Sequence, residues 1–269
     1  MSAAIEFRAV SFATPGSHTN PARLLLDKIS LAVEEGSTTA ILGRSGSGKT
    51  TLMRTVNRMV EPTGGDVLVH GKSTREMELI PLRRGMGYVI QETGLFPHFT
   101  VERNAALVLE AEGRPRQERT RRSHDLLTAV GLEPAKFASR YPHQLSGGQR
   151  QRVGLARALA ADPPILLMDE PFGALDPLTR AEMQDMLREL MSRMKKTVLL
   201  VTHDLDEALY LADRIVLLAD GKLIANLAPT EFLSSQQPDV AAYVQAFHRG
   251  ERSMAAQNST LASGGPNAT

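Results

Sequence analysis

The chain has 269 residues, no cysteine, and 31 lysines and arginines against 30 aspartates and glutamates, which gives a net charge of +1. The lack of cysteine excludes disulfides and thiolate metal sites, and the near-neutral charge provides no general field for binding nucleic acid. No apolar run approaches the ~20 residues of a membrane-spanning helix, and the N-terminus lacks the basic and apolar regions of a signal peptide, so the composition is typical of a soluble cytoplasmic enzyme.

The first motif is a glycine-rich loop between a predicted buried strand at 38–42 and a predicted helix at 49–59. Glycines let the backbone adopt positive φ and approach phosphate oxygens, and the N–H groups at a helix N-terminus favour an anion. This setting favours a phosphate-binding loop over an incidental turn, with Lys49 reaching the β- and γ-phosphates and the Thr50 hydroxyl on Mg²⁺. The predicted nucleotide-binding residues of the loop are Gly43, Arg44, Ser45, Gly46, Ser47, Gly48, Lys49, Thr50 and Thr51.

The middle of the chain has no second phosphate-binding pattern before residue 145. Strands are predicted at 66–69 and 87–90, and Gln91 follows the second strand directly. Helices are predicted at 101–112 and 119–130. We therefore expect a helical region in this part of the chain.

A second glycine-rich turn, Leu-Ser-Gly-Gly-Gln at residues 145–149, opens a helix that is predicted to run to about residue 160. Its serine hydroxyl and backbone N–H groups stand at a helix N-terminus, where they can face a phosphate. The apolar run at 165–168 then predicts a central parallel strand, followed directly by Asp169 and Glu170. Open α/β sheets bind ligands at this end of their strands, so we expect Asp169 to hold Mg²⁺ and Glu170 to orient the attacking water.

The next predicted elements are a helix at 177–195 and a strand at 198–201 that His203 follows. The helix carries apolar residues at spacings of three and four, which suit core packing better than an adaptable methionine-rich binding face. This stripe consists of Met183, Met186, Leu187, Leu190, Met191 and Met194. The polar, unperiodic end of the chain, at 250–269, is expected to be disordered.

Over about residues 5–233, the order of these motifs resembles the ATP-binding subunit of ATP-binding cassette (ABC) transporters. The resemblance implies an α/β fold of the P-loop NTPase class, an ABC cassette with a RecA-like core, an N-terminal antiparallel β-region and a helical subdomain. The corresponding division is 1–91 for the first part of the ATP-binding core, 92–145 for the helical subdomain, 146–249 for the second part of the core, and 250–269 for the tail.

The same resemblance implies roles for individual residues, with ATP and Mg²⁺ as the cofactors. Gln91 stands where the family has its Q-loop, which senses Mg²⁺ and water, and residues 174–176 resemble the D-loop. His203 resembles the switch histidine that contacts the γ-phosphate. The expected catalytic residues are Glu170, His203 and Gln91, and the expected metal ligands are Thr50, Gln91 and Asp169. The signature residues Ser146, Gly147, Gly148 and Gln149 are expected to act on ATP held by the opposite subunit of a homodimer.

The segments around Gln91 and Glu170 look most like those of importers of glycine betaine, choline and related quaternary amine osmoprotectants. The implied partners are a second ATPase subunit, integral membrane permease subunits and a separate substrate-binding protein, without nucleic acid. The implied location is the cytoplasmic face of the inner (plasma) membrane, peripheral through the permease. An importer or lipid-trafficking ATPase with another substrate is the alternative, followed by a non-transport ABC ATPase of translation or DNA repair.

Three surface features also carry expectations. The family usually stacks an aromatic residue on adenine, but that position falls on Thr14, so either Phe12 or His18 is expected to substitute or the stacking is expected to be weak. The apolar residues 94–97 after Gln91 are expected to line a groove for a short permease helix. The arginines at 114, 116, 119, 121 and 122 fit a membrane-facing surface, but a solvated linker and helix face is the simpler interpretation.

Overall fold

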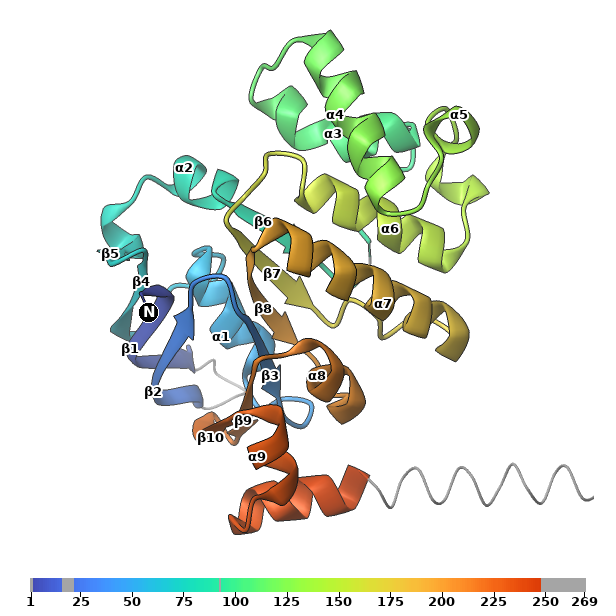
Figure 1. Cartoon of the computed structure of the whole chain (residues 1–269). Helices are drawn as coiled ribbons and strands as arrows, with labels where there is room; N and C mark the ends of the chain where they lie inside the picture. The colour runs from blue at the N-terminus through green and yellow to red at the C-terminus, as the bar shows by residue number, and fades with distance from the viewer. Residues whose placement is uncertain (1, 16–21, 92, 248–269) are drawn as a thin grey trace, which may run out of the picture.

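The computed structural model describes residues 2–15, 22–91 and 93–247; the predicted tail at 250–269 and His18 lie outside these ranges. The glycine-rich loop lies in the part of the molecule that contains two β-sheets (Figure 1). The smaller sheet is antiparallel and has the order β2-β1-β4-β5. Its strands are β1 (Ala3–Thr14), β2 (Arg23–Glu34), β4 (Gly64–Val69) and β5 (Lys72–Ser73).

The larger sheet has the order β10-β9-β3-β8-β7-β6, and all its neighbouring pairs are parallel except β9 with β10. Its strands are β3 (Thr38–Leu42), β6 (Met86–Val89), β7 (Ile165–Asp169), β8 (Thr197–Val201), β9 (Arg214–Ala219) and β10 (Lys222–Leu227). The central strands β7 and β8 are buried along their whole length, as their continuous apolar runs predict. The carboxyl ends of β3, β7 and β8 therefore meet at one edge of this sheet.

Helices cover both faces of the larger sheet. They are α1 (Lys49–Val56), α2 (Leu79–Arg84), α6 (Gly147–Ala158), α7 (Pro177–Met194), α8 (Leu205–Leu211) and α9 (Pro229–Ser234), and residues 238–247 are also helical. The apolar side of α1 packs in a core that includes both sheets, whereas α6 and α7 pack on the other side of β7 and β8. Burial of these apolar faces, rather than helix propensity alone, stabilises such short helices.

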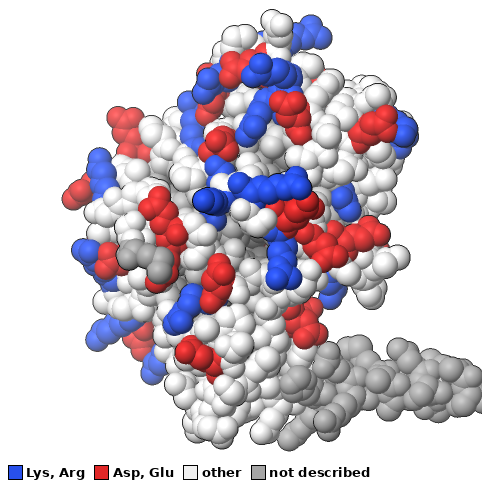
Figure 2. All heavy atoms as spheres, viewed as in Figure 1, with Lys and Arg blue, Asp and Glu red and all other residues white. Residues whose placement is uncertain are grey.

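The helices α3 (Val101–Ala111), α4 (Arg116–Ala129) and α5 (Pro134–Phe137) gather at one end of the molecule, at the top of Figure 1. Two short 3₁₀ helices, Thr74–Glu76 and Pro142–Gln144, complete the described elements. Figure 2 shows basic and acidic side chains interspersed over this end of the molecule. Arg114 pairs with Glu112 and Glu118, and Arg119 pairs with Glu110, which is the behaviour of a solvated charged face.

The predicted fold class is confirmed, and the differences concern element ends. The first helix ends at Val56 instead of residue 59, because Arg58 adopts a left-handed φ of 52° and the N–H of Met59 bonds back to the carbonyl of Arg54. Helix α4 begins at Arg116, three residues earlier than expected, directly after Pro115, whose fixed φ suits the start of a helix. The methionine stripe of α7 packs as predicted, with Met183 only 1% exposed.

No helix among the described residues combines the length and the apolar character that crossing a membrane would require.

Candidate functional site

The glycine-rich loop connects β3 to α1 in a conformation that only glycine allows at two positions. Gly43 has φ 154° and a Cβ there would lie 2.3 Å from the carbonyl oxygen of Leu218. Gly48 has φ 99° and its Cβ would lie 2.7 Å from the carbonyl oxygen of Leu25. By contrast, a Cβ on Gly46 would meet nothing within 4 Å, so this part of the loop borders open space. The result is a tight backbone cradle whose open side can accept an anion.

Lys49 spans this cradle. Its side chain is buried, and Nζ donates to the carbonyl oxygens of Gly43 at 2.9 Å and Arg44 at 3.1 Å. Burial lowers the pKa of the Lys49 ammonium, and the carboxylates of Glu170 and Asp169 act in the opposite direction. The Lys49 ammonium thus donates to two neutral carbonyl oxygens. Phosphate oxygens can take their place as acceptors and form stronger, charge-assisted hydrogen bonds.

A hydroxyl and a carboxylate meet beside the loop. Thr50, at the start of α1, donates from Oγ1 to Oδ1 of Asp169 at 2.7 Å, and Asp169 is only 6% exposed at the end of β7. The other carboxylate oxygen of Asp169 lies 3.4 Å from Nη2 of Arg54, whose Nε bonds to the hydroxyl of Tyr88. Hard oxygen donors of this kind suit Mg²⁺, which normally takes one or two protein oxygens and completes its shell with phosphates and water. The residues present therefore fit a magnesium-nucleotide complex.

Glu170 and His203 form the second pair at this sheet edge. Nδ1 of His203 lies 3.2 Å from Oε2 of Glu170. Glu170 adopts a left-handed φ of 45°, and its N–H continues the sheet by bonding to the carbonyl of Val201 at 2.9 Å. A non-glycine residue at positive φ is strained, and such strain concentrates at functional sites. The backbone here turns sharply, so that the Glu170 side chain follows Asp169 at the same edge.

The turn that carries His203 is fastened from three sides by residues that the sequence analysis did not single out. Glu207 Oε2 accepts from the hydroxyl of Thr202 at 2.8 Å, and this hydroxyl accepts from the N–H of Asp204. Further contacts come from helix α7, where Arg180 pairs with Asp204 at 3.2 Å, and from the last described helix, where the hydroxyl of Tyr243 donates to the carbonyl of His203 at 3.3 Å. The sequence signal that could have identified Asp204 and Glu207 is their Asp-x-x-Glu spacing, which is typical of a helix N-terminus.

The second glycine-rich turn forms the N-terminus of α6. Ser146 caps the helix, with Oγ accepting from the N–H of Gln149 at 3.2 Å while Gln149 Oε1 accepts from the N–H of Ser146 at 3.0 Å. Ser146 and Gly147 are exposed, whereas Gly148 is buried against Thr179. The Gln149 side chain is thus used for capping. Gln91 is exposed and borders a hollow that Gly147 also lines.

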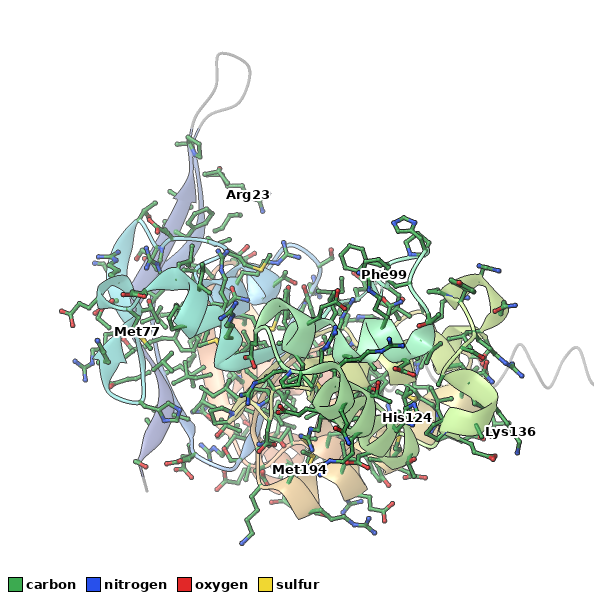
Figure 3. The ribbon with its side chains drawn as sticks, turned by 90° about the horizontal axis from the view of Figure 1, so that it is seen from above. Arg23, Met77, Phe99, His124, Lys136 and Met194 are labelled. Atoms are coloured by element: carbon green, nitrogen blue, oxygen red, sulfur yellow. The ribbon has the colours of Figure 1, made fainter. Side chains whose placement is uncertain are left out.

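The two proposed substitutes for the adenine aromatic differ in placement. Phe12 packs against the core of the smaller sheet, and His18 lies outside the described residues. Thr14 pairs with Arg23 across β1 and β2, and Figure 3 shows Arg23 near the end of this hairpin. Arg23 also borders a hollow of about 370 Å³ that the loop residues 44–47 and Tyr243 line. This hollow lies beside the cradle on the side of β9, away from Asp169 and Glu170.

The chain resembles known proteins over most of its length. The family model described as "ABC transporter" matches residues 26–173. The osmoprotectant import ATP-binding protein OsmV of Salmonella typhimurium is 46% identical over 78% of this chain and 55% of its own. The choline transport ATP-binding protein OpuBA of Bacillus subtilis is 43% identical over 84% of this chain and 58% of its own. The chain thus spans a little over half the length of these relatives.

Solved structures show the same architecture. The dimeric bacterial ABC transporter cassette MJ0796 is 34% identical, with a TM-score of 0.75 over 84% of this chain and 98% of that one. A dimeric post-hydrolysis state of the same cassette, bound to ADP and Pi, is 33% identical with the same TM-score. Since the family model covers more than half of the chain and the relatives exceed 40% identity, the chain belongs to the ATP-binding cassette family of ABC transporters.

Proposed function

We propose that the chain is the ATP-hydrolysing subunit of a bacterial ABC importer. One observation carries the proposal: the phosphate cradle, the Thr50–Asp169 contact and the Glu170–His203 contact lie together at the carboxyl edge of β3, β7 and β8. Phosphoryl transfer requires positioning and charge stabilisation more than covalent chemistry, and these residues supply both.

Each residue has a defined part in this proposal. Lys49 and the loop N–H groups hold the β- and γ-phosphates, and Thr50 and Asp169 hold Mg²⁺, which neutralises charge on the phosphates when bound. Glu170 orients a water through its carboxylate and accepts the proton that the water gives up. His203 is held beside Glu170 and donates a hydrogen bond to the γ-phosphate. Gln91, on the neighbouring loop, is the expected further contact to Mg²⁺ and water.

We infer that two copies of the chain work together. Ser146 and Gly147 are exposed at the N-terminus of α6, where backbone N–H groups and the helix dipole attract an anion. The related cassette whose structure is similar to this chain is described as dimeric. In the proposed dimer, Ser146, Gly147 and Gly148 of one copy face ATP in the cradle of the other, while Gln149 maintains the cap.

The names of the relatives support an osmoprotectant as the transported solute, with glycine betaine or choline as the first candidates. The proposed partners are integral membrane permease subunits and a separate substrate-binding protein, and the permease subunits would hold the chain at the cytoplasmic face of the inner membrane. The segment after Gln91 is suited to contact the permease. Phe96 is 43% exposed, while buried Asn104 binds its backbone N–H and carbonyl and Arg157 binds the carbonyls of Thr93 and Gly94.

The cradle is tested with the purified chain and Mg-ATP. Lys49→Ala is expected to weaken nucleotide binding by at least tenfold, whereas the control Lys72→Ala on exposed β5 leaves it unchanged. Equal affinity of wild type and Lys49→Ala would contradict the assignment of the cradle. For the solute, vesicles containing the complete complex should accumulate glycine betaine or choline with ATP inside. Uptake of a neutral sugar instead would reject the osmoprotectant assignment while leaving ATP hydrolysis intact.

A further inference from the structure

A small hollow lies between the end of β7 and the turn after β8. Glu170, Arg180, Thr202, His203 and Glu207 contribute to its wall. The centre of a water molecule can occupy about 10 Å³ of this hollow. This is about the space that one water needs. The hollow therefore connects the two residues assigned to hydrolysis, Glu170 and His203, with a buried carboxyl group behind them.

Two buried polar atoms on this wall have no hydrogen-bonding partner among the described residues: Nε of Arg180 and Oε1 of Glu207. Buried polar atoms are nearly always paired, with protein or with ordered water. Both residues border the space that fits one water, so a water bound there is the candidate partner for these two atoms. It would accept the N–H of Arg180 and bond to the carboxyl group of Glu207.

The protonation state of Glu207 follows from its surroundings. The residue is 4% exposed, and burial raises its pKa to about 8. The hydrogen bond from Thr202 and the charge of Arg180 act against this rise, while the charges of Asp204 and Glu170 add to it. His203 also faces the hollow. At neutral pH, Glu207 is thus a neutral carboxylic acid with one proton to donate.

We propose that the hollow binds one water and that Glu207 acts through this water and Thr202 as a positioning residue for hydrolysis, holding the turn that carries His203 beside Glu170. The contacts of the turn support this role. Glu207 accepts from the Thr202 hydroxyl and so orients it, and the oxygen of this hydroxyl accepts from the backbone N–H of Asp204, on the other side of His203. The inference rests on the proposed ATP hydrolysis.

The neutral state is the one that suits the role. Ionised Glu207 would lose the hydrogen that it can donate to the water, and it would place a third negative charge beside Asp204 and Glu170. We therefore expect kcat of the wild type to fall as the pH rises through about 8, where Glu207 ionises. Glutamine is neutral at every pH, has nearly the same shape, and keeps an acceptor oxygen beside an NH₂ group that can donate in place of the carboxyl O–H.

The first experiment measures kcat and KM for Mg-ATP from about pH 6 to about pH 9.5 in the full chain, a range that includes the pKa of about 8. Glu207→Ala should lower kcat on the order of tenfold with KM within about twofold, and Glu207→Gln should restore most of kcat. In Glu207→Gln, the part of the fall in kcat at alkaline pH that comes from ionisation of Glu207 should also be absent. Glu189→Gln, an exposed residue of α7 paired with Arg193, is the control that keeps the wild-type profile.

The second experiment does not need activity. The infrared C=O band of a protonated carboxylic acid should be present in the wild type at pH 7, vanish above pH 8, and be missing from Glu207→Gln. An unchanged band in the variant would overturn the inference, as would a variant that keeps the alkaline decline or loses activity as fully as Glu207→Ala. A wild type that shows the band but hydrolyses no ATP would instead reject the proposed function and the positioning role that rests on it.

Discussion

Replacing Glu207 by glutamine should change how the stability of the protein depends on pH. Glu207 has a pKa of about 8 in the folded chain and 4.5 as its ordinary value. Between these values the unfolded chain releases the proton and the folded chain keeps it. The free energy of unfolding therefore decreases as the pH rises from 4.5 to 8, and the contribution becomes constant above 8.

The size of the effect follows from the two values. A rise from 4.5 to about 8 corresponds to about 5 kcal/mol at about 1.4 kcal/mol per pKa unit, and linkage places about 2–4 kcal/mol of it between pH 5 and pH 8. Glu207→Gln has no proton to release. As the pH rises from 5 to 8, the free energy of unfolding of the wild type should therefore fall by this amount relative to that of the variant.

The assay is urea unfolding of both proteins without nucleotide at pH 5, 7, 8 and 9, followed by circular dichroism. Comparing the variant with the wild type at each pH cancels the other titrating groups, which the two proteins share. Glu189→Gln, on the exposed face of α7, should follow the wild type at each pH. Parallel stability curves for the wild type and Glu207→Gln would show that Glu207 titrates at an ordinary pKa, and the argument from its burial would be refuted.

Two further predictions concern the surfaces of the proposed assembly. Phe96→Ala removes an exposed ring that stacks on Phe99, and it should reduce transport in vesicles several-fold while basal ATP hydrolysis stays near normal. Unaffected transport would reject the permease contact, and loss of basal activity would indicate a packing role instead. Ser146→Arg places a bulky side chain at the exposed N-terminus of α6 and should prevent formation of the ATP-dependent dimer. The dimer is measured by light scattering in the Glu170→Gln background, and a dimer of unchanged stability would contradict a signature that acts between subunits.

The sequence was sufficient to predict features that depend on short segments. The loop at 43–50 needs a strand before it and a helix after it, and both could be predicted from local patterns. Asp169 and Glu170 follow a strand directly, so their place at a sheet edge could be expected, and the structure brings Asp169 to the Thr50 hydroxyl. The strand order of the larger sheet, by contrast, is set by long-range pairing that no local pattern contains.

Features that combine distant segments could not be predicted in this way. Arg180, Glu207 and Tyr243 come from three different helices, and they converge on the turn at residues 202–204 only after those helices pack. The use of the Gln149 side chain as a helix cap was also missed, although Ser-x-x-Gln is a spacing that predicts a capping box. The hollow that Gln91 shares with Gly147 brings together residues from distant segments, so no local pattern predicts it.

In the proposed function, Glu170 promotes hydrolysis at a site where other residues bind the nucleotide. The direct test is to incubate wild type and Glu170→Gln with Mg-ATP, remove free nucleotide, and identify what remains bound, together with the rate of phosphate release. The amide cannot accept a proton from water, so we predict bound ATP and a rate lowered by at least a hundredfold in the variant. Bound ADP, with phosphate release within about tenfold of the wild type, would contradict this role of Glu170.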